Sequence, residues 1–262
     1  MDNVSIAFAI TLAAGLATVL GSALVFFQKT PSPRTLSFGL AFAAGAMVFV
    51  SLTEIFNKSI ENFGKVSSFG LVWAAIAFLV GLVGVIVLDR LIPNPHETLD
   101  VQDPRFHDQK QSYLKRIGLM SAFAITAHNF PEGLATFFAT VENPTVGLPL
   151  ALAIAVHNIP EGISIAAPIY FATQNKKLTV FACLISGLAE PLGALIGYFV
   201  LKSFLLPETF GWVFGIIAGI MVFLALDELL PAAKRYADGH ETVYGLAGGM
   251  AVMAISLALF AV

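Results

Sequence analysis

The sequence predicts an all-α polytopic membrane protein with eight transmembrane helices, arranged as two inverted three-helix repeats that flank a central helix pair. Of the 262 residues, 57% are hydrophobic and only 12% are charged, whereas a soluble domain carries roughly a quarter charged residues. The mean hydropathy is +0.84, and apolar runs long enough to cross a bilayer recur along the whole chain. We therefore expect a single transmembrane domain over residues 1–262.

Eight segments reach the length of about 20 apolar residues that a membrane span needs. We expect spans at 4–27, 35–56, 67–91, 116–140, 145–171, 178–203, 210–230 and 242–262. No basic residue precedes the first apolar run, so we predict a retained span and not a cleaved signal peptide. The longest polar segment, 93–115, contains three prolines and the histidines His96 and His107. It predicts a flexible cytoplasmic loop, more readily a solvated linker than a segment that captures metal.

The basic residues predict the orientation, because Lys and Arg concentrate in cytoplasmic loops. Placing the first loop in the cytoplasm leaves only Lys58, Lys65 and Lys202 of the 14 basic residues outside. Both termini then face the non-cytoplasmic side. Cys183 is the only cysteine, which excludes an intrachain disulfide and a site built from several thiolates.

The first three spans resemble the last three in sequence. Gly15-Leu16-Ala17 matches Gly187-Leu188-Ala189, Ala44-Gly45-Ala46-Met47 with Glu54 matches Ala218-Gly219-Ile220-Met221 with Glu228, and Phe69-Gly70-Leu71 matches Tyr244-Gly245-Leu246. Two spans separate the repeats, so the repeats cross the membrane in opposite directions, as in many secondary transporters. We predict repeat 1 at about 4–91, central metal-site helices at 116–171 and repeat 2 at about 178–262.

One six-residue phrase occurs in both central spans. It reads His128-Asn129-Phe130-Pro131-Glu132-Gly133 in the fourth span and His157-Asn158-Ile159-Pro160-Glu161-Gly162 in the fifth. A His and a Glu four positions apart share one face of a helix, so each copy presents a nitrogen and a carboxylate side by side. The alternative is a pair of ordinary proline kinks with core histidines, which the duplication disfavours.

Glu132, Glu161 and Glu190 all fall near the middle of their spans, where ionisable side chains are costly and usually mark a pathway. Every Lys and Arg lies at or beyond a span end, so the compensating charge must come from protons or from a bound metal. Neighbouring imidazoles and carboxamides favour a metal. Glu190 has Thr18 as its counterpart in the first repeat, and it is either a ligand or a proton relay.

The doubled phrase, together with Ser186-Gly187-Leu188-Ala189-Glu190-Pro191 in the next span, resembles the ZIP (Zrt-/Irt-like) family of divalent-metal transporters, in particular its bacterial zinc-uptake (ZupT-like) branch. The resemblance covers all eight spans. It implies two metal ions bridged by the two central glutamates. It implies metal ligands at His128, Asn129, Glu132, His157, Asn158, Glu161 and Glu190.

The resemblance also implies a multi-pass protein of the bacterial inner membrane that moves zinc into the cytoplasm by alternating access. Spans 1, 4, 5 and 6 would form the transport bundle, and iron, manganese, cobalt and cadmium would be further transported substrates. No cofactor is expected, and the expected partners are divalent metal ions and the lipid bilayer, without nucleic acid. The pairs Gly215 with Gly219 and Gly245 with Gly249 have the spacing that lets helices approach closely, either in a homodimer or within one chain.

The sequence thus predicts a transporter and not an enzyme. The main alternative is an intramembrane zinc-dependent hydrolase, which needs three protein ligands, an open water position and a separate general base. The His-Glu-x-x-His phrase that commonly supplies these groups is absent. A second alternative is a proton-coupled carrier of an organic cation, but no aromatic cage is evident in the spans.

Overall fold

The structure, a computed structural model, describes residues 3–27, 33–91, 110–202 and 206–260, and it is built of helices over these ranges. Seven of the described helices are long and apolar enough to cross a membrane. The fourth predicted span, 116–140, lies within α5, a helix of 33 residues. The chain is therefore an all-α polytopic membrane protein, as predicted.

The helices follow the predicted spans, with the largest differences at their ends. In order, they are α1 (Asn3–Phe26), α2 (Pro33–Val50), η1 (Ser51–Ile55), α3 (Phe56–Gly64), α4 (Gly70–Leu91), α5 (Lys110–Glu142), α6 (Pro144–Thr173), α7 (Lys176–Leu201), α8 (Pro207–Leu224), η3 (Ala225–Leu229), α9 (Leu230–Tyr236) and α10 (Glu241–Phe260). The start of α5 at Lys110 places the last six residues of the predicted loop in a helix. His96 and His107 lie outside the described residues.

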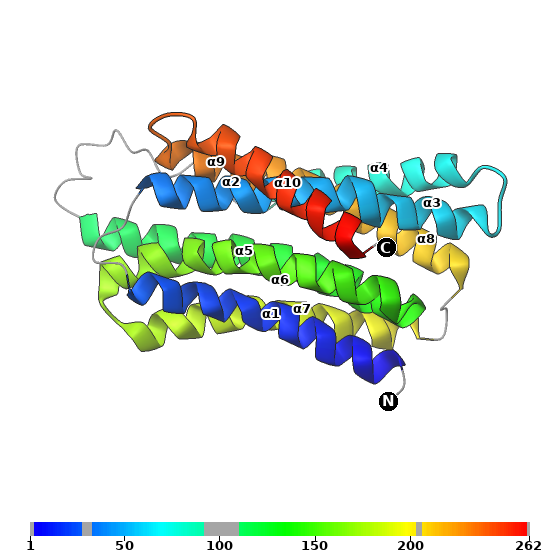
Figure 1. Ribbon diagram of the computed structural model, residues 1–262, viewed down its shortest axis with the longest axis horizontal. Coiled ribbons are helices and arrows are strands. Elements are labelled where there is room, and N and C mark those ends of the chain that lie inside the picture. Colours follow the sequence, from blue (N-terminus) through cyan, green and yellow to red (C-terminus); the bar gives the residue numbers. More distant parts are fainter. Residues whose placement is uncertain (1–2, 28–32, 92–109, 203–205, 261–262) are drawn as a thin grey trace.

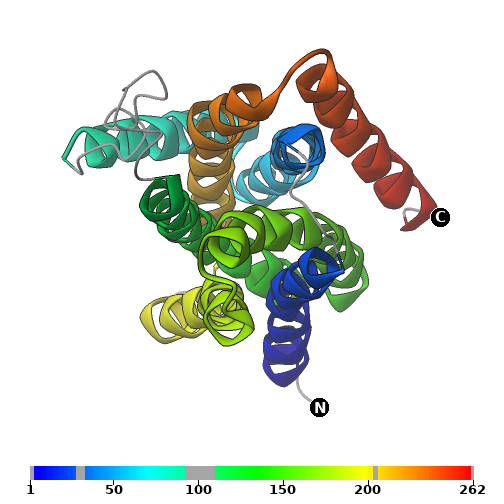
Figure 2. The ribbon, with the colours of Figure 1, turned by 90° about the vertical axis from the view of Figure 1, so that its left-hand side faces the viewer.

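The helices form two groups that pack side by side (Figure 1). We call α1, α5, α6 and α7 the site bundle, and α2–α4 with α8–α10 the support layer. Figure 2 shows α4 and α10 at opposite edges of the support layer. The site bundle consists of predicted spans 1, 4, 5 and 6, the four that were expected to move together.

The packing follows the predicted inverted repeat. The repeat pairs α1 with α7, α2 with α8, α4 with α10 and α5 with α6, and equivalent helices make equivalent contacts. In the site bundle, α1 packs on α6 as α7 packs on α5. In the support layer, α2 packs on α10 as α8 packs on α4. The π-helical turns η1 and η3 also occupy equivalent places, directly after α2 and α8. The helices of each equivalent pair run in opposite directions (Figure 1), so the two halves of the chain are inverted relative to each other.

The third sequence match, in α4 and α10, was aligned in the wrong register. The backbone at Gly45 lies against the carbonyl of Leu246, and the backbone at Gly219 lies against the carbonyl of Phe78. Leu246 is therefore equivalent to Phe78 and not to Leu71, about two helical turns away. The contacts of Gly81 with Ile216 and of Gly249 with Phe42 give the same register. Apolar residues recur along both helices, so sequence similarity alone does not fix which turns correspond.

The paired glycines of α8 and α10 serve packing within the chain. Gly215 faces Ala77 of α4, and Gly245 faces the backbone carbonyl of Phe38 in α2. In both places a larger side chain would push the two helices apart. The glycine spacing is therefore explained by internal crossings and gives no support to a homodimer.

The described basic residues separate into the two ends of the molecule. Arg34, at the start of α2, forms ion pairs with Asp238 (2.7 Å) and Glu241 (3.3 Å) at one end. At the opposite end, Lys65 Nζ lies 2.9 Å from Glu142 Oε1 and joins the support layer to the site bundle. The prediction that every basic residue lies at a span end is wrong for one residue. Lys58 is buried in α3, because the helix that begins as α2 continues to Gly64.

Candidate metal centre

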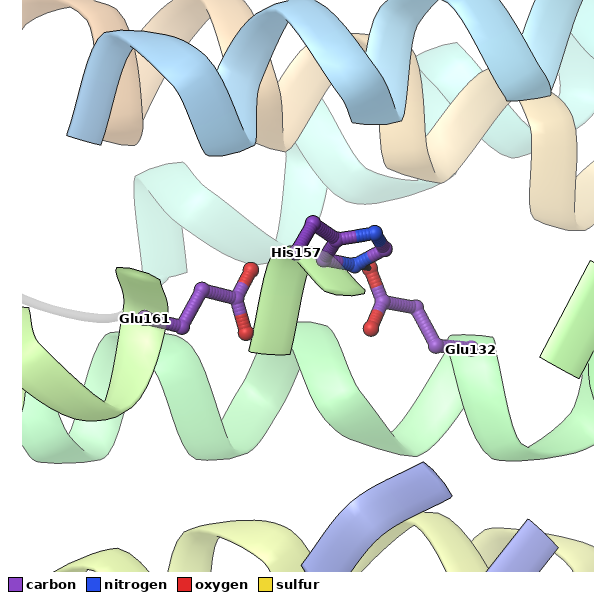
Figure 3. A group of neighbouring side chains, drawn as sticks. All are labelled: Glu132, His157 and Glu161. Atoms are coloured by element: carbon purple, nitrogen blue, oxygen red, sulfur yellow. Dashed lines mark hydrogen bonds and ion pairs between the residues drawn. The ribbon is translucent and has the colours of Figure 1, made fainter. Parts of the chain in front are cut away.

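Three side chains from α5 and α6 converge at the centre of the site bundle. One potential ligand atom of each of Glu132, His157 and Glu161 lies within 4.8 Å of the others (Figure 3). The three side chains are fully buried, and His157 Nε2 lies 3.1 Å from Glu132 Oε1. The four-residue spacing places His157 and Glu161 on one face of α6, opposite Glu132 on α5. The two copies of the repeated phrase therefore build one cluster.

Glu190 joins this cluster from α7. It is fully buried, and its Oε1 accepts a hydrogen bond from Asn158 Nδ2. Its second oxygen, Oε2, has no hydrogen-bond partner. Asn158 therefore connects the carboxylate of α7 with the side chains that α6 presents.

The two asparagines of the repeated phrase are oriented in the same way by α1 and α7. Asn129 Nδ2 donates to the backbone carbonyl (3.0 Å) and to Oγ (3.2 Å) of Ser186. Asn158 Nδ2 donates to the backbone carbonyl of Ala14 at 2.9 Å, and Ala14 is the repeat counterpart of Ser186. Because the amide nitrogens are used in this way, each carboxamide oxygen is left buried and without a partner.

The cluster holds an unusual number of buried polar atoms without hydrogen-bond partners, whereas most such atoms in proteins are paired. They are Asn129 Oδ1, Glu132 Oε2, His157 Nδ1, Asn158 Oδ1, both carboxylate oxygens of Glu161, and Glu190 Oε2. Most of them are oxygens that accept and do not donate. Such a set of acceptors fits a cation better than it fits further protein groups.

The charge of the cluster points the same way. Within the described residues, none of Glu132, Glu161 and Glu190 forms an ion pair with a lysine or arginine, and the only ionisable basic partner is the imidazole of His157, at Glu132. The buried amine of Lys58 lies 3.8 Å from Glu54, in the support layer. Three buried carboxyl groups that share only one imidazole as a basic neighbour favour the uptake of protons or of metal ions.

Glycines allow the helices of the site bundle to approach closely enough to form this cluster. The backbone at Gly133 lies against the carbonyl of Glu190, and the backbone at Gly162 lies against the carbonyl of Thr18. Gly15 and Gly187 face each other at the crossing of α1 and α7. The sequence interpretation did not assign these roles, although the glycine that ends both copies of the phrase was a visible signal. It also missed the roles of Ser186 and Ala14.

Six of the seven predicted site residues lie in this region. Asn129, Glu132, His157, Asn158, Glu161 and Glu190 are fully buried. His128 belongs to α5, but its side chain lies outside the described part of the structure. Met47 and Met221, which the repeat match pairs with each other, are part of the hydrophobic core.

Comparisons with known proteins agree with this architecture. The sequence model of the ZIP zinc transporter family matches residues 93–257, more than half of the chain. A protein of Neisseria meningitidis serogroup B named zinc transporter ZupT is 70% identical over 262 residues, which cover 99% of this chain and 97% of the relative. Proteins with the same name from Stenotrophomonas maltophilia (63% identical, 99% and 97% covered) and Chlorobium chlorochromatii (48% identical, 99% of both chains covered) are also similar. This chain belongs to the ZIP zinc transporter family.

Proposed function

We propose that this protein transports zinc across the membrane and into the cytoplasm through the buried cluster of the site bundle. The proposal depends above all on one observation, which is that three buried carboxyl groups lie beside imidazole and amide groups and, in the part of the chain that the structure describes, no lysine or arginine balances them. A divalent cation supplies the missing positive charge. The printed names of the similar proteins, zinc transporters at 48 to 70% identity, support the same function.

We assign the metal ligands to the seven residues that the repeated phrase and α7 contribute. They are His128, Asn129, Glu132, His157, Asn158, Glu161 and Glu190. Glu132 and Glu161 face each other within the cluster, so we assign them the bridging positions between two metal ions. Imidazole suits zinc and iron, while carboxylate and amide oxygens accept manganese. Because no thiolate is present, iron, manganese, cobalt and cadmium are further proposed substrates.

Movement of the ion requires the two layers to shift against each other. The ligand side chains are fully buried, so an ion at the cluster is closed off until the site bundle changes its position relative to the support layer. The site bundle carries all of the proposed ligands, and its helices pack mainly on one another. We propose that it moves as a unit and exposes the cluster to each side in turn.

Membership of a family of transporters argues against the alternative of an intramembrane hydrolase. Radioactive zinc uptake into proteoliposomes tests the proposal directly. We expect uptake that is saturable and well above that of protein-free liposomes. Iron, manganese, cobalt and cadmium should each compete. Absence of uptake over the background would contradict the proposed function.

The orientation is proposed from the distribution of the basic residues. We place the protein in the bacterial inner membrane, with the end that carries Arg34 and Lys176 in the cytoplasm and both termini outside. Cys183 is buried, so it should not react with an impermeant thiol reagent. In Asn3→Cys, the reagent should label the introduced cysteine when it is added to intact spheroplasts. Labelling only after lysis would indicate the opposite orientation. A homodimer stays a prediction, tested by the mass of the purified protein in detergent.

A further inference from the structure

Thr18 has a buried hydroxyl group without a partner, close to the proposed metal centre. The side chain is fully buried in α1, and its Oγ1 makes no hydrogen bond. Threonine hydroxyls inside helices usually donate to the carbonyl four residues earlier. Several in this protein do so, namely Thr53 to Phe49, Thr126 to Ala122, Thr140 to Thr136, Thr173 to Ile169 and Thr179 to Asn175. The buried hydroxyls of Thr11, Thr18 and Thr136 do not.

At Thr18 the absence of this hydrogen bond has a structural cause. The carbonyl four residues before Thr18 is that of Ala14, and it accepts the hydrogen bond from Asn158 Nδ2 at 2.9 Å. The hydrogen bond that orients one proposed ligand therefore takes the acceptor that Thr18 would otherwise use. A buried hydroxyl without a partner is costly, so a partner from outside the protein is expected.

The inverted repeat relates Thr18 to Glu190. A Cβ atom added at Gly15 would lie 3.4 Å from Glu190 Cβ, and one added at Gly187 would lie 3.5 Å from Thr18 Cβ. Thr18 and Glu190 thus flank the crossing of α1 and α7 in equivalent positions. Glu190 contacts Asn158, and the repeat counterpart of Asn158 is Asn129, whose Oδ1 also has no partner. The repeat therefore assigns Thr18 to the Asn129 side of the cluster.

We propose that the Thr18 hydroxyl is a specificity-determining group of the metal centre, which holds a water molecule of the entering ion beside Asn129. This inference rests on the proposed transport function and deepens it. Hydroxyl and amide oxygens are hard, neutral donors, which suit ions that favour oxygen ligands, such as Mn²⁺, more than Zn²⁺, which also binds imidazole well. Water-mediated contacts of this kind contribute nearly as much as direct hydrogen bonds.

The test removes the hydroxyl and keeps the shape of the side chain. In Thr18→Val, the Mn²⁺ concentration that halves zinc uptake into proteoliposomes should rise about three- to tenfold, the effect of one lost hydrogen bond. The KM for zinc should change less than about twofold. Thr18→Ser keeps the hydroxyl and should behave like the unmodified protein.

Thr179→Val is the matched control, because Thr179 is also buried in a helix of the site bundle but donates to Asn175 at 2.9 Å. It should leave the competition by Mn²⁺ unchanged. An unchanged competition in Thr18→Val, or an equal shift in Thr179→Val, would overturn the inference. If Thr18→Val does not fold, Thr18→Ala removes the same hydroxyl and carries the same expectation.

Failure of this inference is distinguishable from failure of the proposed function. If Thr18 has no role in selectivity, zinc uptake still depends on Glu132 and Glu161. If the function itself is wrong, variants of these two glutamates retain whatever zinc uptake the unmodified protein shows. Measuring all of these variants in one set of proteoliposomes separates the two outcomes.

Discussion

Replacement of Glu132 or of Glu161 by alanine should abolish zinc uptake while the protein stays folded. Each carboxylate faces the other within the cluster, and each has at least one oxygen without a partner. Loss of a group that only supports a ligand lowers metal affinity or activity by about 10- to 100-fold, so loss of a proposed bridging ligand should cost at least about a hundredfold. Zinc uptake into proteoliposomes, with the amount of inserted protein determined separately, measures the effect.

The effect on the fold should differ between the two variants. Neither carboxylate oxygen of Glu161 has a hydrogen-bond partner, so its loss leaves no protein group unpaired, whereas the loss of Glu132 removes the partner of the buried His157 Nε2 at 3.1 Å. Without zinc, the thermal unfolding midpoint of Glu161→Ala should be unchanged or higher, since a costly buried group has been removed, and that of Glu132→Ala should be lower, since His157 Nε2 loses its partner. Zinc should raise the midpoint of the unmodified protein, because it binds the folded state, and it should not do so in the variants. Glu208→Ala, at an exposed acid of α8, and His107→Ala should change uptake little. Near-normal uptake in both cluster variants would refute the site.

Gly133→Ala should destabilise the protein and stop transport, although the added group is a single methyl. A Cβ at this position would collide with the backbone carbonyl of Glu190, and a backbone atom cannot move aside as a flexible side chain can. Overpacking of this kind costs about 1–3 kcal/mol, and it would push α7, with Glu190, away from α5. The unfolding midpoint in detergent and the rate of zinc uptake should both fall.

Gly84→Ala provides the comparison, since a Cβ there would meet nothing within 4 Å. In the interior of α4 the change should leave stability equal or raise it by up to about 1 kcal/mol, because alanine favours a helix more than glycine does. Uptake should remain normal. If Gly133→Ala has effects as small as those of Gly84→Ala, the close approach of α5 and α7 is not needed for transport.

The sequence was sufficient to predict the helical class, the approximate spans and the residues of the cluster. The spans follow from hydrophobicity, and a His and a Glu four residues apart must share a helix face, so the α6 half of the cluster follows from spacing. The hydrogen bonds from Asn129 to Ser186 and from Asn158 to Ala14 could not be predicted from the sequence. A backbone carbonyl can accept a hydrogen bond whatever its side chain, so residue type does not reveal it.

The missed features have a common physical origin. The π-helical turns η1 and η3, the burial of Lys58 and the alignment of Phe78 with Leu246 all depend on how one helix lies on another. Apolar composition, which predicts that a helix lies in the membrane, says little about the rotation and the axial position of that helix. Those two quantities are determined by contacts between segments far apart in the chain.

The ion pair between Lys65 and Glu142 bears on the resting state of the protein. Perfectly equivalent halves would give the two facing states equal free energies, so a bias arises only where the halves differ. The ion pairs described at the opposite end, those of Arg34 with Asp238 and Glu241, lie within the support layer and do not join it to the site bundle. An ion pair that is partly exposed contributes at most about 1 kcal/mol, which is about a fivefold difference in population. The chain should therefore rest more often with the Lys65 end shut, and an arriving ion needs to overcome only this small preference.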